Sequence, residues 1–199
     1  DGKALFYLLQ VKPLIGNDTD YSIDFKKTNT ENSLVISQNS MGNGLIDYIE
    51  DIIIIPPEKF DNQKTQEIAK EVSAFNNQMM EENREYLLIG PGRWGSRDKW
   101  IGVPVLWSQI SKARVIVEAG LPDFPLEASA GSHFFHNVTS MNVAYMSIKH
   151  NSKQEFIRWD KFANHDIKKE TKYVQHIRLK KPLTIQIDGK KRITVITEG

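Results

Sequence analysis

The stretch of residues 90–97 combines residue types that bind phosphate groups. Its three glycines satisfy the spacing G-x-G-x-x-G directly after an apolar run, and two arginines lie among them. Backbone N–H groups exposed by a glycine loop and planar guanidinium groups both bind phosphate oxygens. The predicted phosphate-binding residues are Gly90, Gly92, Arg93, Gly95, Ser96 and Arg97. The alternative is a tight turn whose Trp94 and Trp100 pack onto the core.

Two well-characterised phosphate motifs do not fit this loop. In a dinucleotide-binding fold, a helix follows the glycines and holds the pyrophosphate at its N-terminus. Glu118 lies where such a fold keeps its acidic residue, but Gly102 and Pro104 interrupt the segment where the helix belongs. A P-loop needs Lys-Ser or Lys-Thr after its last glycine, where this chain has Ser96-Arg97. An anion site of another kind and a tight turn remain open.

His133 is the candidate nucleophile. It follows Ala130-Gly131-Ser132, and these small side chains leave an imidazole ring accessible for phosphoryl transfer. His136 would share a helical face with it, but no third ligand lies nearby, so we expect no metal site. The chain has no cysteine, which excludes disulfides, a thiol nucleophile and cysteine-bound metals. The remaining histidines stand among Lys and Asn and are expected at the surface: His150, His165 and His176.

The first residues resemble part of the phosphoenolpyruvate synthase and pyruvate phosphate dikinase family. Asp1-Gly2-Lys3 through Leu8-Leu9-Gln10-Val11-Lys12-Pro13 is similar to the last strand of that family's ATP-grasp domain, an apolar run followed by Gln-x-Arg-Pro. The resemblance implies that Gln10 and Lys12 bind cofactor, and that ATP and Mg²⁺ occupy the domain upstream. Lys12 keeps the charge of the family's arginine but lacks its planar fork.

A second stretch resembles the family's swivelling phosphohistidine domain. There a strand precedes Gly-Gly-x-Thr-Ser-His-Ala-Ala, whose histidine carries the phosphoryl group. Residues 113–118 resemble the strand, and Gly131-Ser132-His133 resembles the motif, which makes His133 the implied catalytic residue. This chain departs from the family in a longer intervening loop, in Ala130 for the first glycine, and in Phe134-Phe135 for the two alanines.

Three functions stay open. The first is the C-terminal part of a cytoplasmic, ATP-dependent phosphoenolpyruvate synthase-like phosphotransferase, inactive as this fragment alone. Its implied partners are the upstream ATP-grasp domain and pyruvate or a small phosphorylated metabolite, without a membrane. The second is a non-catalytic module that binds a phosphorylated metabolite, favoured by the two phenylalanines and by the lack of room for the family's phosphoenolpyruvate-binding barrel. The third, nucleic-acid binding through the basic residues 149–192, ranks last because no nucleic-acid-binding signature accompanies them.

The elements that must position these residues are predicted to form a mixed α/β, strand-rich fold. Hydrophobic residues make up 40% and charged residues 26% of the chain, as in globular proteins, and no apolar run approaches the roughly 20 residues that span a bilayer. A helix is predicted over residues 64–82, with Ile68, Val72, Phe75 and Met79 on one face and Asp61 or Asn62 as its cap. Short helices are expected at residues 108–113 and 154–162. Strands are expected at residues 33–37, 51–55, 86–89, 114–118, 143–148, 173–179, 184–187 and 193–196.

The domain organisation follows from the resemblance and from composition. Residues 1–15 are expected to be the last ATP-grasp strand, residues 16–32 a linker, and residues 33–150 the swivelling phosphohistidine-like domain. Residues 151–199 are expected to be a basic extension packed on the same domain, with a β-hairpin that turns at Asp188-Gly189. Because the chain opens without an initiator methionine, we interpret it as a fragment of a longer protein.

Overall fold

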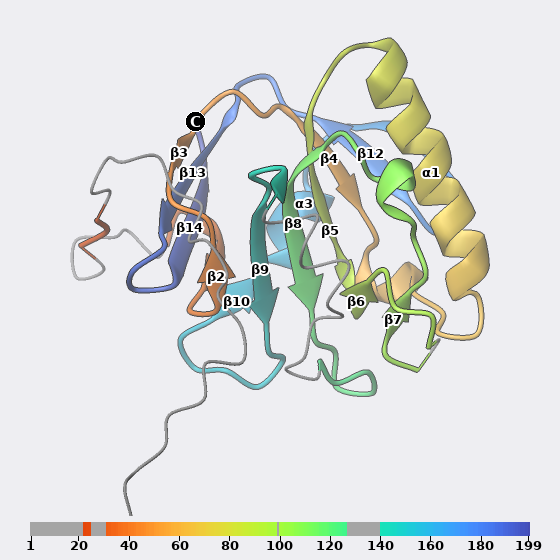
Figure 1. Cartoon of the computed structure of the whole chain (residues 1–199), viewed down its shortest axis with the longest axis horizontal. Coiled ribbons are helices and arrows are strands. Elements are labelled where there is room, and N and C mark those ends of the chain that lie inside the picture. Colours follow the sequence, from red (N-terminus) through yellow and green to blue (C-terminus); the bar gives the residue numbers. More distant parts are fainter. Residues whose placement is uncertain (1–21, 25–30, 99, 127–139) are drawn as a thin grey trace, which may run out of the picture.

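The computed structural model describes residues 22–24, 31–98, 100–126 and 140–199. They form a mixed α/β fold that is richer in strand than in helix. Two β-sheets pack face to face, and helix α1 (Thr65–Glu81) covers the outer face of the larger sheet (Figure 1). The layers are therefore helix, sheet and sheet.

The larger sheet has seven strands, and its four central strands are parallel. In spatial order they are β11 (Ile167–Glu170), β12 (Gln175–Arg178), β4 (Asp51–Ile54), β5 (Tyr86–Pro91), β8 (Ala113–Ala119), β9 (Ala144–Ile148) and β2 (Ser40–Met41). Strands β4, β5, β8 and β9 run parallel to one another. Their neighbours β12 and β2 run antiparallel to them, and the edge strand β11 is antiparallel to β12. Buried on both faces, the parallel strands are nearly continuous apolar runs, which is why the sequence predicts them well.

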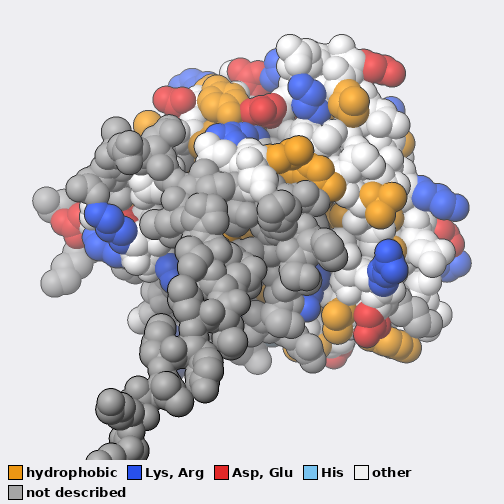
Figure 2. Space-filling model, in the orientation of Figure 1, with side chains coloured by type: hydrophobic (Ala, Val, Ile, Leu, Met, Phe, Trp, Pro, Cys, Tyr) orange, Lys and Arg blue, Asp and Glu red, His pale blue; other side chains and the backbone are white. Residues whose placement is uncertain are grey.

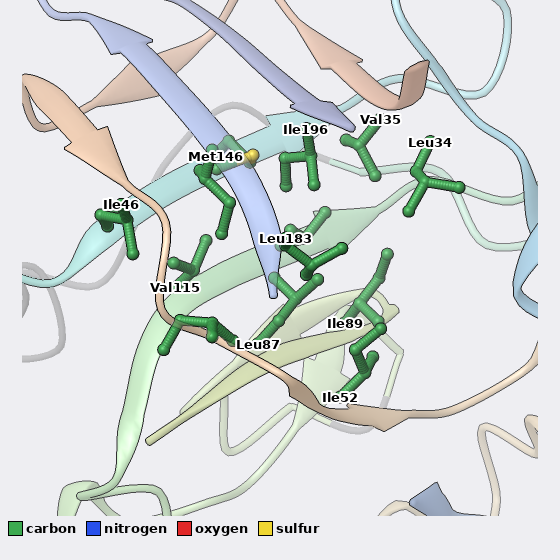
Figure 3. Packing of buried hydrophobic residues seen from close by; sticks show 14 of the residues in the cluster. Leu34, Val35, Ile46, Ile52, Leu87, Ile89, Val115, Met146, Leu183 and Ile196 are labelled. Atoms are coloured by element: carbon green, nitrogen blue, oxygen red, sulfur yellow. The ribbon is translucent and has the colours of Figure 1, made fainter. Parts of the chain in front are cut away.

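The smaller sheet is antiparallel. Its order is β10 (Phe156–Ile157), β1 (Ser33–Ser37), β14 (Ile193–Glu198), β13 (Leu183–Asp188) and β3 (Gly44–Ile46). The pairing of β13 with β14 confirms the predicted hairpin, but its turn spans residues 189–192, because Asp188 still pairs with Ile193. Apolar side chains from the facing sides of both sheets form one core, and Figure 3 shows Leu34, Leu87, Val115 and Leu183 within it.

Helix α1 carries the four predicted apolar residues on its buried face, which packs against the outer face of the larger sheet. The predicted cap is wrong: Lys64 is the N-cap residue and its side chain makes no capping hydrogen bond. Asp61 instead accepts a hydrogen bond from the Gln63 amide in the preceding turn, at 2.8 Å.

Three short helical segments complete the part of the fold that the structure describes. They are the 3-10 helices η2 (Pro57–Lys59) and η3 (Trp107–Gln109) and helix α3 (Trp159–Ala163). The expected helix over residues 154–162 is wrong in its first half, where β10 pairs with β1. None of the helices in the described ranges is long and apolar enough to cross a bilayer.

Residues 151–199 contribute strands to both sheets. Strands β11 and β12 extend the larger sheet beside β4, whereas β10, β13 and β14 belong to the smaller sheet. Four aromatic side chains of this segment lie in the hydrophobic clusters or pack against them, namely Phe156, Trp159, Phe162 and Tyr173.

Candidate functional site

The predicted phosphate loop lies at the carboxyl edge of the parallel strands. Strand β5 ends in Gly90-Pro91, and its neighbour β8 ends in Glu118-Ala119, directly alongside in register. The loop continues into the two-stranded pair of β6 (Arg93–Trp94) and β7 (Gly102–Val103), which lies beyond the arrowheads of β5 and β8 in Figure 1. Ligands of open α/β sheets bind beyond this edge.

The loop amides are occupied by acceptors of the protein itself. The N–H of Gly92 donates to Ala119 O at 2.8 Å, and that of Arg93 donates to Ile101 O at 2.9 Å. The N–H of Trp94 donates to Glu118 Oε1 at 3.0 Å, and that of Gly95 donates to Val103 O at 2.8 Å. Four consecutive amides are thus committed internally. An anion bound here would depend on side chains rather than on a backbone cradle.

Close packing explains why two of the glycines are needed. Gly92 has φ +75°, and a Cβ at this position would clash with the ring of Phe124. A Cβ on Gly90 would lie 3.0 Å from Trp94 Cζ2, because the indole ring covers this point of β5. Trp94 is buried and donates from Nε1 to Val117 O at 3.1 Å. Trp100, in contrast, is 58% exposed, so only Trp94 meets the tight-turn expectation.

Glu118 fastens the loop to the sheet. Its Oε1 accepts from the Trp94 amide, and its Oε2 accepts from the Tyr145 hydroxyl on β9 at 2.5 Å. Burial raises the pKa of Glu118 to about 7, and the two hydrogen bonds and the charge of Arg93 oppose that rise only in part. Burial and the neighbouring carboxyl likewise raise the pKa of Tyr145. A carboxyl group that titrates near neutrality therefore lies directly beneath the glycine loop.

The polar side chains of the loop differ in their surroundings. Arg93 is 8% exposed and acts electrostatically on Glu118 and Tyr145. The Ser96 hydroxyl accepts from the Asp98 amide at 3.2 Å and belongs to a local turn. Arg97 is exposed, and its guanidinium makes no hydrogen bond or ion pair with any residue that the structure describes. Arg97 is thus the accessible positive charge of the loop.

Several predicted site residues lie outside the described residues. Gln10 and Lys12 fall in residues 1–21, and His133 and His136 fall in residues 127–139. The segment that contains His133 joins the carboxyl end of β8 to the amino end of β9. Residues 120–126, the described beginning of this connection, follow β8 at the edge where residues 90–97 lie.

A second polar cluster, at the opposite edge of the parallel strands, was not predicted. Asp51, at the start of β4, is fully buried and accepts from His176 Nε2 at 2.7 Å, Arg84 Nε at 2.5 Å and Arg178 Nε at 2.6 Å. Burial alone would raise the pKa of Asp51, but these three hydrogen bonds outweigh it and lower the pKa. The expectation that His176 lies at the surface is wrong, since β12 turns its ring toward the buried Asp51 and the ring of Phe75.

The basic residues 149–192 belong to a segment that contributes strands to both sheets. Several of these side chains bind within the fold: Lys161 to Glu31 O, Lys168 to Glu82, Lys191 to Ile23 O, and Arg178 to Asp51 and Glu82. On the face drawn in Figure 2, basic, acidic and hydrophobic side chains are interspersed over the coloured area. Within the described part of the chain, no three His, Asp or Glu side chains are grouped to hold a metal ion.

Comparisons with models of protein families, with curated proteins and with solved structures found no match.

Proposed function

We propose that this chain is the C-terminal part of a phosphoenolpyruvate synthase-like phosphotransferase. In this proposal a swivelling phosphohistidine-like domain carries a phosphoryl group from ATP on His133, and the loop of residues 90–97 stabilises that group. The resemblance assigns ATP and Mg²⁺ to a domain upstream of Asp1. The role proposed for this chain therefore concerns only the carrier histidine and the loop.

The observation that carries the proposal is the shared edge of the sheet. The arginine-bearing loop extends from β5, and the connection that later includes His133 begins at the same end of the adjacent parallel strand β8. Arg97 is exposed there, and a guanidinium fork matches the oxygens of a phosphoryl group. Charge on a transferring phosphoryl group requires such partners.

One specific observation favours the second candidate, a non-catalytic module that binds a phosphorylated metabolite. The amides of residues 92–95 are bonded within the protein, so they are not available to stabilise the charge of a transition state. Arg97 alone can bind a phosphate modestly, but one exposed guanidinium group supplies less electrostatic stabilisation than a catalytic site generally provides.

The chain itself can be tested for binding with phosphoenolpyruvate as the probe and backbone amide NMR shifts as the readout. We expect saturable shifts at residues 95–98 and their loss in Arg97→Gln. Lys70→Gln, on the exposed face of α1, is the matched control because it removes one exposed positive charge elsewhere. Equal binding by Arg97→Gln and the wild type would contradict a role for the loop.

A further inference from the structure

A cleft on the far side of the fold from the glycine loop has the features of a separate binding site. Its volume is about 440 Å³, within the range of small-molecule sites. It lies where the end of β12, the turn after α3 and the end of β14 meet, next to the Arg178–Asp51 pair at the amino end of β4. The polar side chains that line it and that matter here are Asn164, His165, Asp166, Lys180, Lys181 and Glu198.

Two lysines supply the unneutralised positive charge of this cleft. Arg178 is already paired with Asp51 and Glu82, and His165 Nε2 lies 3.1 Å from Glu198 Oε1. Lys180 and Lys181 are exposed, and within the described ranges neither ammonium group has an ion-pair partner. A negatively charged ligand can pair with both lysines, while Asp166 and Glu198 lower the net side-chain charge of the lining to +1 with His165 neutral.

The backbone that carries the two lysines is fixed on both sides. The amide of Leu179, just before them, donates to Glu50 O at 2.9 Å. The amide of Leu183, just after Pro182, donates to Ile49 O at 2.7 Å. Both leucines are buried in the core between the sheets. The backbone of Lys180 and Lys181 is therefore held before a ligand binds, which lowers the backbone part of the entropic cost of binding.

The rest of the lining selects the kind of ligand. Leu179 is the one large apolar side chain in contact with the cleft, so the lining suits a hydrophilic molecule better than a lipid or an aromatic ring. Asp166 and Glu198 would repel a second anionic group, but together with Asn164 they accept hydrogen bonds from hydroxyl groups. A phosphate monoester carries a charge between −1.5 and −2 at neutral pH, close to the charge of two lysines.

We propose that this cleft binds a small hydroxylated phosphate ester of the sugar-phosphate class. Lys180 and Lys181 hold the phosphate, and Asn164, Asp166 and Glu198 face the hydroxyl groups. This site is separate from the loop of residues 90–97 and does not depend on the function proposed for that loop.

The test uses the whole chain with glucose 6-phosphate as the probe and amide NMR shifts as the readout. We expect saturable shifts at residues 164–166, 180–181 and 198. The affinity should fall about tenfold in Lys180→Gln/Lys181→Gln, since two exposed ion pairs are lost, and should weaken as salt is added. Lys70→Gln/Lys153→Gln, which removes two exposed lysines elsewhere, should bind like the wild type.

Three results would overturn the proposal. The first is the absence of saturable shifts at the cleft in the wild-type chain, a result that does not depend on whether a variant folds. The second is equal affinity for the two double variants. The third is equal affinity for inorganic phosphate and glucose 6-phosphate, which would show that the sugar hydroxyl groups make no contacts that contribute to binding. Binding in the cleft should survive Arg97→Gln, so failure here and failure at the glycine loop can be told apart.

Discussion

Glu118→Gln tests the role of the buried carboxyl group that fastens the glycine loop. Gln keeps an acceptor for the Trp94 amide and offers an NH₂ group to the Tyr145 oxygen, so the geometry is retained and only ionisation is removed. Because burial raises the pKa of Glu118 from 4.5 to about 7, the folded protein holds this proton at pH values where the unfolded chain has lost it. The contribution of Glu118 to stability is therefore greatest below pH 4.5 and is lost as the pH rises toward 7.

The magnitude follows from the pKa. Each tenfold change in proton affinity is worth about 1.4 kcal/mol, so ionised Glu118 costs the folded state about 3 kcal/mol above pH 7. Its side chain is almost completely buried, so solvent screens little of this cost. The variant does not incur this cost, because its side chain cannot ionise. Relative to the wild type, Glu118→Gln should gain about 2 to 3 kcal/mol between pH 5 and pH 8.

Urea unfolding of both proteins across this pH range measures the difference directly. The difference between variant and wild type cancels the titration of all other groups. Glu81→Gln, at an exposed glutamate on α1, controls for the loss of a surface carboxylate, and Glu118→Gln should gain more stability than this control as the pH rises. A difference for Glu118→Gln that is flat, or that falls as the pH rises, would refute the reasoning.

Three further substitutions, the first with Gly44→Ala as its control, test the packing and the polar clusters by the same unfolding method. Gly92→Ala should cost about 3 kcal/mol, because it adds a ring clash to a left-handed φ, whereas Gly44→Ala has open space and should cost about 1 kcal/mol; equal costs would contradict the packing argument. Asp51→Asn should cost about 3 kcal/mol, because two guanidinium groups and an imidazole lose a buried carboxylate; a loss below about 1 kcal/mol would show that the cluster is not coupled. Tyr145→Phe removes a hydrogen bond that lowers the pKa of Glu118, so the loss of stability with rising pH should extend to higher pH; an unchanged pH profile would disprove that link.

The sequence predicts the central strands well, because parallel strands buried on both faces are short apolar runs such as Ile52 to Ile55. Helix α1 is equally clear, since its apolar residues recur at helical spacing. Its start is less clear. Asp61 and Asn62 have the right chemistry for a cap, but a 3-10 turn follows Pro56 and the helix begins only at Thr65. The exposed edge strand β11 has no apolar alternation, so nothing in its sequence predicts it.

The polar clusters could be predicted only in part, because they join residues far apart in the chain. Glu118 stands out as the acidic residue of an apolar strand, but its partner Tyr145 comes from another strand and is indistinguishable from a core tyrosine. His176 lies between Gln175 and Ile177, and its buried hydrogen-bond partner Asp51 comes 125 residues earlier. The glycines of residues 90–97 fit a phosphate loop by spacing, yet the β6–β7 pairing that occupies their amides is a tertiary contact.

The central proposal, that this chain carries a phosphoryl group, is tested most directly by phosphorylation of the parent protein with its upstream domain. The protein is incubated with ATP and Mg²⁺, and acid-labile phosphate is located by intact mass and peptide mapping. The proposal predicts one labile phosphate on His133, its absence in His133→Ala, and a reduced yield in Arg97→Gln but not in Lys70→Gln. A parent protein that binds ATP and yet gains no labile phosphate would contradict it and favour the non-catalytic binding module.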